Sequence, residues 1–165
     1  MRFHLVDRLT RLELGESVEG FKCWSMADDV FQDHFPGRPV VPGVLLVESM
    51  AQMMGFLLQW SYHAKFGRER EPHAILSIIH KAKFRRTVIP GDRVDMVGRI
   101  ISMDTKRASC TVRGTVDGET RVDADLSFVW YVVDRGELPP ELLMQRESYE
   151  RNVLVGLPSE VDLLQ

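Results

Sequence analysis

The sequence predicts a single α+β domain in which an antiparallel sheet curls around one long buried helix. Its 165 residues fit one domain of ordinary size. Residues 44–64 form the one long apolar stretch, and most of the chain after them has the composition of strands. Because a lone helix cannot supply a whole core, a sheet wrapped around it is the simplest arrangement.

The first part of the chain indicates two short strands followed by an irregular loop. Residues 3–9 and 17–25 alternate loosely enough for strands, and Leu14-Gly15-Glu16 lies between them as a turn. Residues 26–43 contain proline and glycine at positions 36, 37, 39, 42 and 43, so we expect no regular structure there.

The predicted helix runs from residue 44 to about 64 and ends near Gly67. Residues 44–62 contain one ionisable side chain, Glu48, and a membrane-spanning helix needs about 20 mostly apolar residues. Polar side chains interrupt the segment, however, and no basic flank sets an orientation. We therefore expect a buried core helix and no membrane span.

The remainder of the domain is predicted to be an antiparallel meander. The segments rich in β-branched and aromatic residues are 74–79, 83–88, 94–102, 108–116 and 120–133. Asp117-Gly118 separates two of them and predicts a hairpin, because both turn residues need positive φ. We divide the chain into a domain of residues 1–135 and a C-terminal extension of unknown role, residues 136–165.

The extension begins around Pro139-Pro140, and residues 141–151 could form a short polar helix. Val153-Leu154-Val155 and Leu163-Leu164 could attach it to the body or to a partner chain. A partly ordered appendage is the alternative.

Composition excludes several classes of function. The net charge of −3 argues against general nucleic-acid binding, which requires a basic surface. The two cysteines, Cys23 and Cys110, have no metal-ligand spacing and form no close pair, as expected for a reducing, cytoplasmic location. The first eight residues carry charges where a signal peptide needs an apolar run, so we expect no secretion signal.

Two side chains with acid–base chemistry lie near each other in the sequence: His34 in the loop and Glu48 in the predicted helix. Histidine is the natural base at neutral pH. A carboxylate buried in apolar surroundings tends to become neutral, and a neutral carboxylic acid can act as a general acid. Each residue also has an ordinary interpretation, because Glu48 could be a first-turn residue stabilised by the helix dipole and His34 a solvent-facing loop residue.

The loop that carries His34 is unusually constrained. Its prolines restrict φ and its glycines permit tight backbone geometry, so the loop could hold His34 near the start of the helix. The residues concerned are Pro36, Gly37, Pro39, Pro42 and Gly43.

Gly43 would leave its N–H open at the positive end of the helix, where it could bind an anion or the developing oxyanion of a thioester carbonyl. Gln52 lies one helical turn after Glu48 and could hold its side chain by a hydrogen bond. A base, an acid and an oxyanion donor are the parts needed to remove an α-proton and expel a β-hydroxyl.

These residues resemble a known family. The segment HFPGRPVVPGV at residues 34–44, with Glu48 and Ala51-Gln52, is similar to the (3R)-hydroxyacyl-[acyl carrier protein] dehydratases of bacterial type II fatty-acid synthesis. Further matches are Leu5-Val6-Asp7-Arg8 and KFRRTVIPGD at residues 83–92. The resemblance covers roughly residues 3–133, in the order and spacing of the family.

The resemblance implies a hotdog fold, a curled antiparallel sheet around one central helix. It also implies homodimers with joined sheets, often three dimers to a hexamer, and an active site shared between subunits. By position, His34 would be the base, Glu48 the acid, and the Gly43 amide the thioester-carbonyl donor, with Gln52, Pro42 and Gly37 in support. A glutamate at position 48 resembles the branch that dehydrates without isomerising the new double bond.

The implied substrate is an acyl chain on the phosphopantetheine arm of acyl carrier protein, and the resemblance implies no metal and no organic cofactor. Because carrier protein is acidic, its docking surface should be basic. The candidates are Arg38, Lys81, Lys83, Arg85 and Arg86, although such a cluster could equally be a solvated face.

Two other functions fit the same fold, since hotdog domains serve several chemistries. In an acyl thioesterase, Glu48 would activate water or attack the thioester. A non-catalytic acyl-binding module would need neither His34 nor Glu48. The sequence also departs from the family pattern at Asp33, where glycine is usual, and at Ala74-Ile75-Leu76, which lacks a common aromatic residue. The latter leaves the acyl-length preference open.

Overall fold

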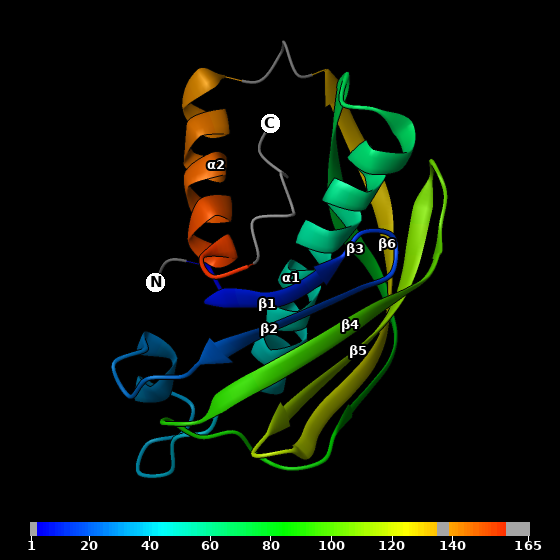
Figure 1. Cartoon of the computed structure of the whole chain (residues 1–165). Helices are drawn as coiled ribbons and strands as arrows, with labels where there is room; N and C mark the ends of the chain where they lie inside the picture. The colour runs from blue at the N-terminus through cyan, green and yellow to red at the C-terminus, as the bar shows by residue number, and fades with distance from the viewer. Residues whose placement is uncertain (1–2, 135–138, 158–165) are drawn as a thin grey trace.

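The computed structural model describes residues 3–134 and 139–157. The elements are β1 (Arg8–Glu13), β2 (Ser17–Cys23), the 3₁₀ helix η1 (Asp29–Gln32), α1 (Gly43–Phe66), β3 (Arg70–Phe84), β4 (Arg93–Met103), β5 (Arg107–Val116), β6 (Glu119–Asp134) and α2 (Pro140–Leu154). Six strands make one antiparallel sheet in the order β1-β2-β4-β5-β6-β3, which curls around α1 (Figure 1). The predicted α+β class is confirmed.

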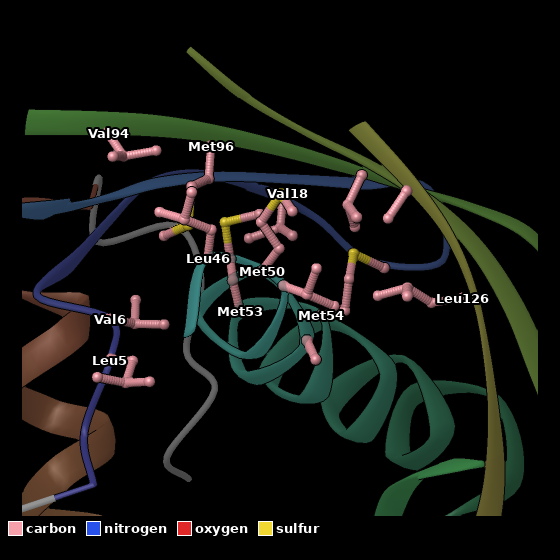
Figure 2. Close-up of a cluster of buried hydrophobic side chains, with 14 of the residues drawn as sticks. Leu5, Val6, Val18, Leu46, Met50, Met53, Met54, Val94, Met96 and Leu126 are labelled. Atoms are coloured by element: carbon pink, nitrogen blue, oxygen red, sulfur yellow. The ribbon is translucent and has the colours of Figure 1, made fainter. Parts of the chain in front are cut away.

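Methionines of α1 fill part of the core between the helix and the sheet. Met50, Met53 and Met54 are fully buried on α1 and point toward the sheet (Figure 2). Glycines in the facing strands make room for them, since a Cβ built on Gly98 of β4 would overlap the Met54 sulfur. Methionine adapts its shape to irregular gaps, so the helix can pack closely on the sheet here.

The N-terminal strand differs from its prediction. Strand β1 begins at Arg8, whereas residues 3–9 were expected to form it. The Leu5 N–H donates instead to Gln52 Oε1 at 2.9 Å, and the Phe3 carbonyl accepts from Gln52 Nε2 at 3.2 Å. These backbone groups therefore pair with a helix side chain. The second strand and the turn at residues 14–16 lie where they were predicted.

The region after α1 also differs. Instead of two strands at 74–79 and 83–88, β3 is one strand of 15 residues, which pairs with β6 at the far edge of the sheet. The meander is confirmed only for β4, β5 and β6. Its Asp117-Gly118 turn has the two positive φ values predicted, 51° and 78°. Periodicity identifies strands but not their neighbours, because strand order depends on pairing between distant segments.

Helix α2 confirms the helix expected in the extension and packs against β1. The Val153 side chain is buried in the hydrophobic core, with 1% of its surface exposed, so this part of the extension packs against the domain. Residues 136–138 and 158–165, including Leu163-Leu164, lie outside the described residues. Within the described ranges, no helix has both the length and the apolar character needed to cross a membrane.

Candidate active site

The His34 side chain is held in one tautomer by its own loop. Its Nδ1 lies 2.7 Å from the Val40 carbonyl oxygen, and the His34 carbonyl accepts from the Val40 N–H at 2.9 Å. A carbonyl oxygen can only accept, so Nδ1 must carry the hydrogen. In the neutral ring, Nε2 then keeps a free lone pair, as a general base requires.

The loop geometry depends on glycine at position 37. Gly37 has φ of 74°, a left-handed conformation that glycine adopts without strain. The turn around it is closed by two backbone hydrogen bonds between Phe35 and Arg38, at 3.0 and 3.3 Å. Gly37 therefore belongs to the frame that holds His34 in place.

Helix α1 begins at Gly43, directly after the loop, with Pro42 as its N-cap and no side chain capping it. The N–H groups of Leu45 and Leu46 donate to the Pro42 carbonyl. The first N–H groups of a helix have no partner within the helix, and those of Gly43 and Val44 have no hydrogen bond within the described part of the chain. They are open donors at the positive end of α1.

Phe84, at the end of β3, covers Gly43. A Cβ built on Gly43 would lie 2.7 Å from Phe84 Cε1, so a larger residue here would displace the ring or the helix start. Phe84 lies in the family-like segment 83–92, but the sequence alone did not predict its contact with Gly43. The available signal was one apolar residue among Lys83, Arg85 and Arg86.

His34 and Gly43 share one pocket. It has a volume of about 490 Å³ and mostly apolar walls. The other lining residues are Val40, Val41, Val44, Leu46 and residues 84–88. A candidate base and the residue at an open helix N-terminus therefore line the same apolar space. This arrangement can bind a carbonyl oxygen and take a nearby proton.

Glu48 does not line this pocket. It lies half-buried on α1, and its Oε1 accepts a hydrogen bond of 3.0 Å from Gln52 Nε2. No hydrogen bond joins Glu48 to His34 in the part of the chain that the structure describes. The predicted Glu48–Gln52 pair is present. The contacts of Gln52 with the backbone of residues 3 and 5 were not predicted, because backbone groups leave no trace in the sequence.

The five candidate docking cations divide into two groups. Arg85 is paired with Asp123 through two hydrogen bonds of 3.1 and 3.2 Å, and Arg86 with Glu119 at 2.8 Å. The others are exposed and have no ion pair among the described residues: Arg38, Lys81 and Lys83. No cluster of three or more His, Cys, Asp or Glu suited to a metal ion occurs in the described ranges.

The curled antiparallel sheet, its single central helix and the histidine loop at the helix start define a hotdog-type domain with a candidate acid–base site. Residues 1–125 match the model of the FabA-like domain, and the chain belongs to this family.

Similar proteins include three named 3-hydroxyacyl-[acyl-carrier-protein] dehydratase FabZ. The Aliarcobacter butzleri protein is 37% identical over 131 residues, which are 79% of this chain and 88% of that protein. The Rickettsia felis protein is 37% identical over 134 residues, 81% of this chain and 88% of the relative. The Clostridium acetobutylicum protein is 33% identical over 125 residues, 76% and 85% of the two chains.

Two solved structures share the fold. A chain of the dehydratase heterocomplex ApeI:P from Xenorhabdus doucetiae superposes with a TM-score of 0.53 at 17% identity, covering 72% of this chain and 92% of that one. A conserved protein from Pseudomonas aeruginosa has a TM-score of 0.55 at 18% identity, covering 75% and 87%. The predicted hotdog fold is confirmed.

Proposed function

We propose that this protein is a hydro-lyase that dehydrates (3R)-3-hydroxyacyl thioesters, carried on acyl carrier protein, to trans-2-enoyl thioesters in fatty-acid or related lipid or polyketide biosynthesis. One observation carries the proposal: His34, whose Nδ1 is tied to the Val40 carbonyl, and Gly43, at the open start of α1, line one apolar pocket. The relatives named above, which bear this activity in their names, support it.

The chemistry follows from the geometry. The thioester carbonyl accepts a hydrogen bond from the Gly43 N–H, which acidifies the α-carbon and stabilises the developing oxyanion. His34 Nε2 takes the α-proton. Glu48, as the general acid, gives a proton to the leaving β-hydroxyl, and water departs as the carbon–carbon double bond forms.

The site is proposed to be completed by a second copy of the chain. Glu48 lies outside the pocket of its own His34, so the acid facing His34 would come from a partner subunit. Strand β3 is an unpaired edge of the sheet and exposes Ile75, Ile78 and Ile79 at 50, 52 and 49%. An apolar edge strand is a ready site for pairing with another chain. We propose that two chains join their sheets through β3 to form a dimer. Three such dimers would form a hexamer.

The docking surface for acyl carrier protein is proposed to include Arg38, Lys81 and Lys83, because these cations have no carboxylate partner among the described residues. Arg85 and Arg86 line the pocket, but their charges are already balanced by Asp123 and Glu119. An acidic carrier would gain more from the unpaired cations.

The test is turnover of 3-hydroxyacyl thioesters of several lengths, on carrier protein and on coenzyme A, with the product followed by mass spectrometry as loss of one water. Each of His34→Ala and Glu48→Gln should lower turnover by about 10²–10⁴-fold while the fold survives. Near-normal turnover by either variant contradicts the assignment. Release of free thiol without the enoyl product indicates a thioesterase, and tight acyl binding with no chemistry indicates a binding module.

A further inference from the structure

Helix α2 follows the part of the chain that matches the FabA-like domain. It lies against the N-terminal segment, residues 3–7 (Figure 1). Tyr149 makes the contact. Its ring centroid lies 3.9 Å from that of His4 and 5.5 Å from that of Phe56 on α1, and its hydroxyl donates to the Val6 carbonyl at 3.3 Å. Burial raises the pKa of Tyr149 to about 12, so the hydroxyl keeps its proton at neutral pH.

The other end of this segment is fixed by Asp7. Its Oδ1 accepts from Lys22 Nζ at 2.8 Å, and its Oδ2 accepts from the Cys23 N–H at 2.7 Å. The segment is therefore anchored to α2 at residues 4 and 6 and to the end of β2 at residue 7. Without α2, the segment would lose the ring contact at His4 and the hydrogen bond at Val6.

The anchored segment sets the orientation of the Gln52 side chain. The Leu5 N–H needs an acceptor, so the amide oxygen of Gln52 must face it. The amide nitrogen of Gln52 then faces the Phe3 carbonyl and Glu48 Oε1, and it donates to both. Reversing the amide would set two donors against each other at Leu5 and two acceptors against each other at Glu48.

We propose that α2 is a positioning element for the candidate acid: Tyr149 holds residues 3–7, these residues orient Gln52, and Gln52 fixes Glu48. The inference rests on the proposed role of Glu48 as the general acid. It gives the C-terminal extension a role in the reaction although none of its described residues lines the pocket.

The test is a double-mutant cycle in the full-length protein, with Tyr149→Leu, Gln52→Leu and the two together. We expect Tyr149→Leu to lower kcat by about fivefold, the effect of weakening the Gln52–Glu48 hydrogen bond, with little change in KM. In the Gln52→Leu background the same change should leave kcat unaltered, while Tm falls equally in both backgrounds. Tyr149→Phe, which keeps the ring, should retain most of the activity.

Two further variants complete the experiment. Leu142→Ala, at an exposed position of α2, is the matched control and should change neither kcat nor Tm. If Tyr149→Leu does not fold, His4→Ala removes the same ring contact from an exposed position and replaces it in the cycle.

An unchanged kcat in Tyr149→Leu overturns the inference. So does a double variant whose loss in kcat equals the product of the two single losses. If the wild-type protein has no dehydratase turnover, the proposed function fails, and the positioning role is judged by NMR. Hydrogen exchange of the Gln52 side-chain amide should then be faster in Tyr149→Leu than in the wild type. Equal exchange rates overturn the inference independently of any activity.

Discussion

Gln52 Nε2 donates a hydrogen bond of 3.0 Å to Glu48 Oε1 across one turn of α1. The same amide holds the backbone of Phe3 and Leu5. Glu48 is the one carboxylate on α1. Its side chain is held by the Gln52 amide, which is itself fixed by the Leu5 N–H and the Phe3 carbonyl.

Replacing Gln52 by leucine should lower both activity and stability. Gln52→Leu removes all three hydrogen bonds at similar volume, so Glu48 is no longer held and the Leu5 N–H has no acceptor. We expect kcat to fall about tenfold and the free energy of unfolding to fall by about 1–3 kcal/mol. Steady-state kinetics and chemical denaturation measure the two effects. Wild-type kcat in a folded Gln52→Leu protein contradicts a positioning role for Gln52.

Adding a methyl group at Gly43 should disturb the helix start. In Gly43→Ala the new Cβ would meet the Phe84 ring at 2.7 Å, so either the ring or the helix start must move. We expect a loss of stability of about 1–3 kcal/mol and lower kcat. Adding Phe84→Leu in the same chain should relieve the clash and recover part of the stability. A Gly43→Ala protein with unchanged stability and kcat would show that Phe84 does not constrain this position.

Two sheet glycines should differ in their tolerance of alanine. The Cβ of Gly98→Ala would meet the flexible Met54 side chain, which can move, so the cost should be about 1 kcal/mol. The Cβ of Gly20→Ala would meet the backbone carbonyl of Arg8 at 2.6 Å, which can move only with the strand. Denaturant titration should therefore rank Gly20→Ala as the more destabilising change. The opposite order contradicts the view that the methionine core is adaptable.

Charges on the edge strand should break the proposed dimer. Ile75→Lys with Ile78→Lys places two cations on the apolar edge of β3, so we expect a monomer in light scattering and loss of turnover. Ile101→Lys is the matched control, because Ile101 on β4 is also exposed, at 66%, but lies away from this edge. A doubly substituted protein that remains dimeric and active contradicts pairing through β3.

Sequence reasoning located what depends on local pattern. The helix was predicted from its apolar run, and the Asp117-Gly118 hairpin from the φ values that the turn needs. Strand order was not predicted correctly, because β3 pairs with β6 across a long interval of sequence. At the candidate site, the sequence predicted His34 and Gly43, which line one pocket, and the Glu48–Gln52 hydrogen bond, which is present. The ring of Phe84 over Gly43 and the hold of residues 3–7 on Gln52 were missed, since both depend on segments distant in the sequence.

The central claim is that His34 and Glu48 act together across two subunits. The most direct measurement mixes the two inactive full-length proteins, His34→Ala and Glu48→Gln, after reversible dissociation, with subunit exchange proven by mass spectrometry of differently labelled chains. A mixed dimer would contain one site with both residues intact. We predict that turnover returns to roughly a quarter of the wild-type value, because half of the dimers are mixed and each has one of two sites active. Complete exchange without recovery of activity would contradict the shared site.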